Sequence, residues 1–133
     1  MRRNRLFRTA LASLIFLVLP GLLICQDAPV VTAEKPVRVF VFSMNQQVDK
    51  GLWRITQTAL EESEEWNADL ILIRMNTYGG LVDMADSIRT KILYYPKPVW
   101  VYIDNNAASA GSLISIACDR IYMRPGANIG AAT

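Results

Sequence analysis

From Lys35 onward, short runs of β-branched and aromatic residues alternate with longer segments of helical periodicity. The runs are VRVFVF at 37–42, LILIRM at 70–75, VWVYI at 99–103 and a shorter one at 121–123. Runs of this composition, bounded by turn residues, are typical of strands. Strands that alternate with helices form a mostly parallel sheet covered by those helices. The order of elements therefore predicts an α/β fold.

Two longer helices are expected between these strands. Asp49 is placed to cap the first, which should run to about Trp66. The apolar residues expected on its inner face are Leu52, Ile55 and Ala59. The second helix should end before Pro96. Its apolar stripe, spaced by four, three and four residues, is Leu81, Ala85, Ile88 and Ile92.

Residues 1–33 have the composition of a leader. Four arginines in the first eight residues precede an uncharged, mostly apolar stretch at 9–26. This pattern predicts a signal peptide or an N-terminal membrane anchor. The apolar run is short for a membrane span and contains Pro20-Gly21, which favours the signal peptide, with cleavage after Ala33. On either interpretation, residues 34–133 form one partial domain that is exported across a membrane.

The charge of the chain changes once the leader is set aside. The residues after Ala33 carry 10 Lys and Arg against 11 Asp and Glu, so this part is close to neutral. A near-neutral body gives no electrostatic reason to expect nucleic acid as a partner. We expect no metal and no cofactor. Cys118 is expected to be a small buried apolar residue.

Two loops follow neighbouring strands of the expected sheet. They are NTYGG at 76–80 and the segment 104–109, which ends in Ser109. In parallel sheets, the loops at the carboxyl ends of the strands gather at one edge. A Gly-Gly turn leaves backbone N–H groups uncovered, as an oxyanion requires. Ser109 stands at a strand-to-helix junction suited to a nucleophile. Each loop alone is also explained as a tight turn or a helix cap.

Together these motifs resemble a known family. The chain contains NTYGG, then 28 residues, then SAG. The context of SAG is KPVWVYIDNNAASAG, and ACDRIYMRPGANIGAAT follows it. This order of motifs is similar to that of the NfeD-type membrane-associated serine proteases of the ClpP and SppA class. The similarity covers about residues 37–133 and implies a ClpP/crotonase-like fold that is truncated at its C-terminus. It also implies cleavage of peptide bonds by acyl transfer.

The resemblance assigns roles to single residues. Ser109 falls on the family's nucleophile. Gly80 and Ala110 fall on the backbone donors of the oxyanion hole, and Gly79 supports the turn. Tyr78 stands where the family usually has proline, which should leave the turn intact. The resemblance implies a peptide or membrane-protein substrate, and it makes a stomatin-like partner and self-association candidates. It also implies a membrane-associated protein whose protease domain is periplasmic or otherwise extracytoplasmic.

A serine nucleophile needs a base, and this chain contains no histidine. A lysine can serve if its pKa falls from about 10.4 toward 7–8. The four lysines, Lys35, Lys50, Lys91 and Lys97, are each best explained as solvated charges. The resembling family uses a Ser-Lys dyad whose lysine would lie beyond Thr133. We therefore expect an N-terminal fragment that is inactive alone.

Two alternatives remain open from the sequence. The motif around Ser109 also resembles crotonase-type enzymes, which act on acyl-CoA thioesters, although these favour glycine at the serine's position. An exported protein would also rarely meet acyl-CoA. The other alternative is a non-catalytic membrane-associated scaffold that binds a stomatin-like partner. Ser112 and Ser115 on the following helix are expected to be small packing residues.

Overall fold

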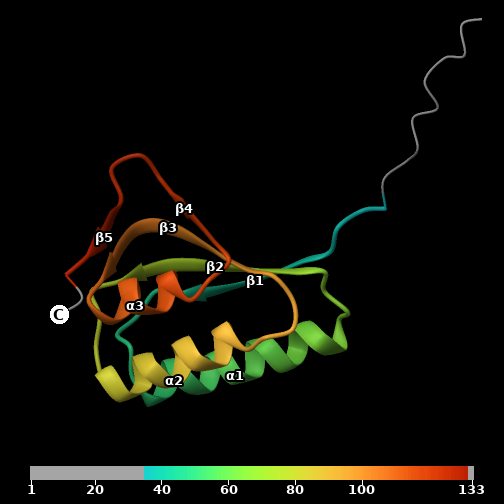
Figure 1. Ribbon diagram of the computed structural model, residues 1–133, viewed down its shortest axis with the longest axis horizontal. Coiled ribbons are helices and arrows are strands. Elements are labelled where there is room, and N and C mark those ends of the chain that lie inside the picture. Colours follow the sequence, from blue (N-terminus) through green and yellow to red (C-terminus); the bar gives the residue numbers. More distant parts are fainter. Residues whose placement is uncertain (1–34, 132–133) are drawn as a thin grey trace, which may run out of the picture. The chain divides into compact units, whose positions relative to one another are not determined.

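In the computed structural model, residues 35–131 are described, and they form one parallel sheet with helices on one of its faces (Figure 1). The elements in chain order are β1 (Val39–Met44), α1 (Lys50–Glu65), β2 (Leu70–Thr77), α2 (Val82–Leu93), β3 (Val99–Ala108), α3 (Ala110–Ile116), β4 (Arg120–Met123) and β5 (Asn128–Gly130). The strand order is β1-β2-β3-β4, and β5 also pairs with β3. All pairs are parallel, so the predicted α/β architecture is confirmed.

The predicted leader at 1–33 lies outside the described residues, as does its boundary with the domain. Within residues 35–131, no helix has both the length and the apolar character that a membrane crossing needs.

The core lies between the sheet and the helices. Alternate residues of β2 and β3 are fully or almost fully buried and belong to one cluster with residues of α1, α2 and α3. The strand members of this cluster include Ile71, Ile73, Met75, Val99, Val101 and Ile103. Alternation of buried and less buried positions arises because successive side chains of a strand point to opposite faces. The predicted runs therefore supply the inner face of the sheet.

Helix α1 begins where the sequence predicts. The Asp49 carboxylate accepts a hydrogen bond of 2.9 Å from the backbone N–H of Leu52, so Asp49 is the N-cap. The prediction that Ile55 lies on the inner face is wrong, because its side chain is 44% exposed. Thr56 is buried instead, and its hydroxyl donates to the Leu52 carbonyl at 2.8 Å. This internal bond lets a polar residue occupy the buried stripe.

Helix α2 begins one residue later than its apolar stripe. Ala85, Ile88 and Ile92 are buried as predicted, but Leu81 is 47% exposed, and its expected place on the stripe is wrong. The backbone N–H of Leu81 donates to the carbonyl of Val48 at 2.7 Å. Leu81 therefore belongs to the turn that precedes the helix.

Strand β3 is twice as long as the predicted 99–103 because residues 104–108, of which the first three are polar, continue it. Its register with β2 shifts, since Met75 pairs with Ile103 but Thr77 pairs with Ala107. Beyond that shift, β3 also pairs with β5, an element that the sequence analysis did not predict. The extension carries the chain directly to Ser109 at the carboxyl end of the strand.

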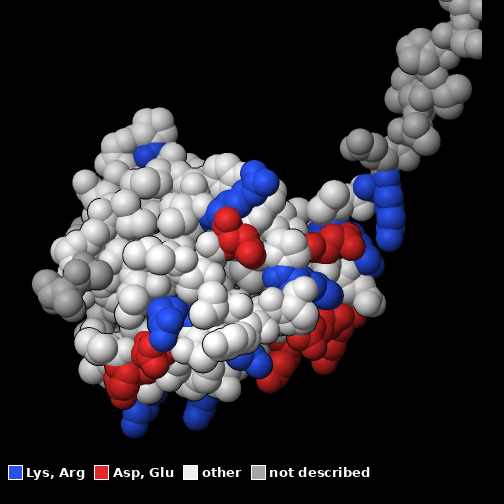
Figure 2. Space-filling model, in the orientation of Figure 1, with Lys and Arg blue, Asp and Glu red and all other residues white. Residues whose placement is uncertain are grey.

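Charged side chains surround this core in small groups. On the face seen in Figure 2, acidic and basic residues lie close together, separated by broad uncharged areas. One such pair joins Arg38 to Asp69, with Nε and Oδ2 3.3 Å apart. The hydrogen bond from Arg38 lowers the pKa of Asp69 below its usual value. Because both side chains are well exposed, the pair contributes little to stability.

The cap of α1 gives a first test. We expect Asp49→Ala to lower the free energy of unfolding by about 1 kcal/mol, because the N–H of Leu52 loses its acceptor. Asp49→Asn keeps a side-chain oxygen at this position and should stay within about 0.5 kcal/mol of the wild type. Urea unfolding of both variants measures the difference. An equal loss in the two would contradict the capping role.

Candidate active site

The two loops singled out in the sequence lie side by side at the carboxyl ends of β2 and β3. Helices α2 and α3, which follow these strands, start at the same side of the sheet (Figure 1). Gly79 has a φ of 109°, a conformation that side chains rarely adopt. A Cβ added to Gly79 would lie 2.8 Å from the Cβ of Ser109 and 3.3 Å from the backbone nitrogen of Ala110. The turn and the serine loop are therefore in direct contact.

Gly80 is held against the segment that precedes α1. Val48 donates its N–H to the Gly79 carbonyl at 2.9 Å and accepts the N–H of Leu81 at 2.7 Å. A Cβ on Gly80 would lie 2.7 Å from the Val48 nitrogen and closer still to the Val48 carbonyl oxygen. Because backbone surrounds both glycines, neither position has room for a side chain.

Ser109 adopts an unusual backbone conformation. Its φ is 51° and its ψ is −115°, values that cost energy in a residue with a side chain. Its backbone N–H donates to the Gly130 carbonyl of β5 at 2.7 Å, which helps to hold this conformation. Ser109 occupies the N-cap position of α3, yet its side chain makes no capping hydrogen bond. The hydroxyl is thus not used as a helix cap.

Two backbone donors, one directly after Ser109 and one directly after Gly79, have no partner within residues 35–131. Among the hydrogen bonds of that segment, none uses the N–H of Gly80 or the N–H of Ala110. The N–H of Gly79, in contrast, donates to the Thr77 hydroxyl at 3.1 Å. Unpaired N–H groups next to a hydroxyl form the arrangement that stabilises an oxyanion during acyl transfer.

Thr77 and Gly111 also belong to this site, although neither was given a role of its own within the motifs NTYGG and SAG that contain them. Thr77 is 2% exposed, and its Cγ2 would lie 2.6 Å from a Cβ added to Gly111. The β-strand alternation of 71, 73 and 75 could have placed Thr77 on the inner face. Nothing in the sequence alone indicates its contact with Gly111.

A groove of about 430 Å³ opens beside the turn. Its lining residues are Asn45, Gln46, Gln47, Asn76, Thr77, Tyr78, Gly79 and Gly80. They carry no charge, and Tyr78 is 80% exposed. Amide side chains both donate and accept hydrogen bonds, so they can pair with the main chain of an extended peptide. The groove thus connects the glycine turn to a surface that can hold such a segment.

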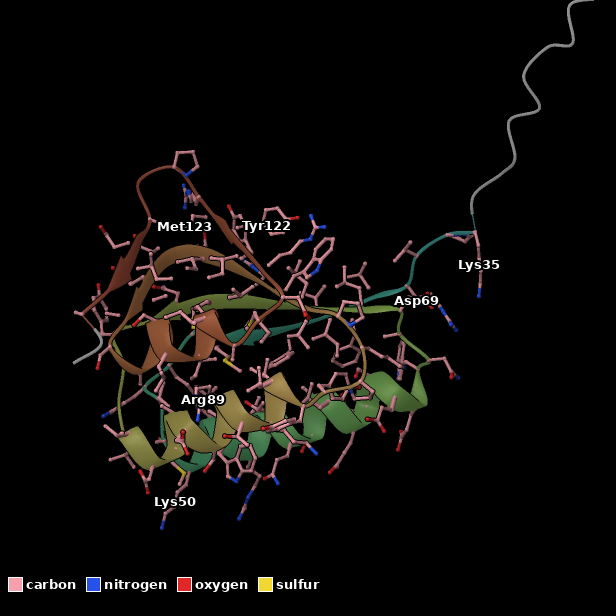
Figure 3. All side chains as sticks on the ribbon, in the orientation of Figure 1. Lys35, Lys50, Asp69, Arg89, Tyr122 and Met123 are labelled. Atoms are coloured by element: carbon pink, nitrogen blue, oxygen red, sulfur yellow. The ribbon has the colours of Figure 1, made fainter. Side chains whose placement is uncertain are left out.

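Among the four lysines of the described residues, Lys35, Lys50 and Lys91 are exposed and Lys97 is half-buried. Lys35 precedes β1, and Figure 3 shows that the side chains of Lys35 and Lys50 extend away from the sheet and helices. Lys91 is exposed in the last turn of α2. Lys97 precedes β3, whose ten residues span about 30 Å before Ser109.

The other candidate nucleophiles of α3 are occupied. Ser112 and Ser115 are buried, and their hydroxyls donate to the carbonyls of Ser109 and Gly111 at 2.7 and 2.8 Å. Burial raises the pKa of the half-buried Cys118 thiol to about 12, so it stays protonated and unreactive. In the part of the chain that is described, no group of acidic or sulfur-containing residues can hold a metal ion.

The tight turn gives a second test. We expect Gly80→Ala to lower the free energy of unfolding by about 1–3 kcal/mol, because the added methyl group meets the Val48 backbone. Tyr78→Ala, in the same turn, removes an exposed side chain and should change stability by less than about 0.5 kcal/mol. Thermal unfolding measures both variants. A Gly80→Ala variant as stable as Tyr78→Ala would show that the turn can open freely.

Comparison with known proteins gives clear relatives. Residues 38–133 match the family described as NfeD1b, N-terminal domain. The membrane protein NfeD1b of Bacillus subtilis is 35% identical over 126 residues, which are 95% of this chain and 28% of that protein. The membrane-bound protease PH1510 of Pyrococcus horikoshii is 31% identical over 96 residues, which are 70% of this chain and 22% of the protease. The chain thus spans less than a third of either relative.

Solved structures share the fold. The 1510-N membrane-bound stomatin-specific protease of P. horikoshii, solved as a serine-to-alanine mutant, has a TM-score of 0.70 and 29% identity over 74% of this chain and 49% of its own. A lysine-to-alanine mutant of the same protease, in complex with a substrate peptide, has a TM-score of 0.69 and 30% identity over 72% of this chain and 45% of its own.

More distant structures have the same architecture. ClpP1 of Listeria monocytogenes has a TM-score of 0.56 and 27% identity over 59% of this chain and 46% of its own. An enoyl-CoA hydratase of Mycobacterium ulcerans, at 16% identity, shares the fold alone, with a TM-score of 0.57 over 65% of this chain and 48% of its own. The predicted ClpP/crotonase-like fold is therefore confirmed. With its family match from residue 38 to residue 133, the chain belongs to the NfeD1b family, whose N-terminal domain it contains.

Proposed function

We propose that this chain supplies the nucleophile and the oxyanion hole of a membrane-associated serine endopeptidase. Ser109 is the nucleophile, and the N–H groups of Gly80 and Ala110 are the donors of the oxyanion hole. The observation that carries this proposal is the pair of unpaired N–H groups beside a serine whose hydroxyl does not cap its helix. Gly79 supports the arrangement by allowing the two loops to touch.

The proposed reaction is acyl transfer. The Ser109 Oγ attacks the carbonyl carbon of the scissile peptide bond while a base takes the hydroxyl proton. The carbonyl oxygen becomes an oxyanion and accepts hydrogen bonds from Gly80 and Ala110. The C–N bond then breaks as the base returns the proton to the leaving amine. Water hydrolyses the resulting ester and regenerates Ser109.

The base in this proposal is a lysine that follows Thr133 in the full-length protein. A lysine-to-alanine mutant of the related 1510-N protease was crystallised with a substrate peptide, which supports a Ser-Lys dyad. The positions of the four lysines in residues 35–131 also favour a base from outside this segment. Such a lysine must lie in a site that lowers its pKa, because a fully protonated amine accepts no proton.

The proposed substrate is a peptide or a segment of a membrane protein. The related 1510-N protease is stomatin-specific, which makes a stomatin-like protein a candidate substrate or partner. The uncharged groove beside Gly80 suits an extended apolar or polar segment better than a charged one. We further propose that residues 1–33 are a leader, that residues 34–133 act outside the cytoplasm at a membrane, and that the protein self-associates.

The role of Ser109 is tested in the full-length protein. We expect Ser109→Ala to lower peptide hydrolysis by at least about 1000-fold and to abolish labelling by a fluorophosphonate, because no other group can form the acyl-enzyme. Ser115→Ala is the matched control on the same helix, and it should keep both activities. Full labelling of the Ser109→Ala protein would contradict the assignment. A wild-type protein that is never labelled would favour the scaffold alternative.

The role of a distant lysine is tested with two lengths of the chain. Residues 1–133 alone should hydrolyse no peptide, because Ser109 lacks a base there. The full-length protein should hydrolyse peptides at a rate that rises about tenfold per pH unit until the lysine is deprotonated, near pH 7–8, since only the neutral amine acts as the base. Peptide cleavage between pH 5 and pH 9 measures this. Ser109-dependent cleavage by residues 1–133 would contradict the proposal.

A further inference from the structure

We propose that Thr77 is a positioning residue for the oxyanion hole, and that the Thr77 side chain sets the separation of the two N–H donors of that hole. The inference rests on the function proposed above for Ser109. Thr77 is the last residue of β2 and is 2% exposed, so very little of its side chain faces the groove that it helps to line. It acts instead through Gly79 and Gly111, which adjoin the residues that carry the two donors.

The hydroxyl of Thr77 fixes the glycine turn. Its Oγ1 accepts the N–H of Gly79 at 3.1 Å and lies 3.5 Å from the Gly79 carbonyl oxygen, to which it can donate. The first bond holds the peptide group before the Gly79 Cα, and the second holds the peptide group after it. The peptide bond that follows Gly79 carries the unpaired N–H of Gly80. The hydroxyl therefore limits rotation of the peptide group that carries the Gly80 N–H.

The methyl group of Thr77 fixes the start of α3. A Cβ on Gly111 would lie 2.6 Å from Cγ2 of Thr77, so the methyl group fills the space left by this glycine. Gly111 follows Ala110, whose N–H is the second donor. The same side chain thus contacts the residue before one donor and the residue after the other.

The register of the sheet brings Thr77 to this place. Met75 pairs with Ile103, whereas Thr77 pairs with Ala107, so β3 contains two more residues than β2 between these pairs. An irregularity of this kind redirects side chains and is common beside active sites. The Asn76 side chain bridges it by accepting the N–H of Asn106 at 3.3 Å. Without this shift, Thr77 would lie opposite Asn105, well short of Gly111.

Two donors stabilise one oxyanion only if both lie about 2.7–3.1 Å from the same oxygen. The two N–H groups here belong to loops that are 30 residues apart in the sequence, so a contact that spans both loops must set their separation. Thr77 makes this contact with its two branches. Loss of this Thr77 contact should reduce stabilisation of the transition state and leave substrate binding in the groove unchanged.

The test uses Thr77→Val and Thr77→Ser in the full-length protein. Thr77→Val keeps both branches but loses the hydroxyl, and we expect kcat to fall by about 10-fold or more with KM within about twofold of the wild type. Thr77→Ser keeps the hydroxyl but loses the methyl group that contacts Gly111, so it should keep the slow Gly79 exchange of the wild type and recover only part of the lost kcat. In Thr77→Val, hydrogen exchange at the Gly79 amide should accelerate, because this N–H loses its acceptor.

Thr56→Val is the matched control, since Thr56 is also buried and its hydroxyl is bonded, but in α1. It should leave kcat and Gly79 exchange unchanged. If Thr77→Val does not fold, Thr77→Ala and Thr77→Ser provide a second pair that differs only in the hydroxyl. A Thr77→Val kcat equal to the wild type, in a protein that Ser109→Ala inactivates, overturns the role of Thr77 alone. Full activity in Ser109→Ala would instead overturn the proposed function. In that case, unchanged hydrogen exchange at the Gly79 amide in Thr77→Val would still contradict the positioning role of Thr77.

Discussion

The contact between Gly79 and Ser109 is the constraint on which the rest of the site depends. Two parallel strands can only bring the loops at their carboxyl ends near each other. Closer approach requires that one loop present bare backbone, and Gly79 does so, with a hypothetical Cβ only 2.8 Å from that of Ser109. Gly80 meets the Val48 backbone in the same way on the other side. The glycines therefore do more than turn the chain, because they let three segments meet within van der Waals distance.

The conformation of Ser109 depends on a segment that follows it. A φ of 51° is unfavourable for serine, and the hydrogen bond from its N–H to Gly130 offsets part of this cost. Gly130 belongs to β5, which pairs with the last residues of β3. This pairing also removes the Ser109 N–H from the set of free donors. The N–H of Ala110 then remains as the free donor next to the serine.

Local patterns in the sequence predict what depends on neighbours along the chain. The alternation in LILIRM predicts the inner face of β2, and the position of Asp49 predicts the start of α1. Features that depend on distant partners were missed or wrong. The length of β3 follows from its pairing with β5. The exchange of Ile55 for Thr56 in the core is the exception, because the Thr56 hydroxyl donates to the Leu52 carbonyl of the same helix, and this local bond was missed. Thr77 has a role only because a register shift sets it opposite Ala107.

The same reasoning explains how this architecture can hold the proposed oxyanion site even when the base comes from another segment. The proposed donors are backbone N–H groups, and in the proposal their positions follow from glycine contacts, strand register and the Thr77 side chain. None of these depends on a titratable residue. Folding can therefore preorganise the electrostatic part of the proposed catalysis, while the proposed proton acceptor comes from a different segment. Structures that share this fold include both a ClpP and an enoyl-CoA hydratase. Function therefore has to be argued from the side chains around the backbone site, of which Ser109 is the decisive one here.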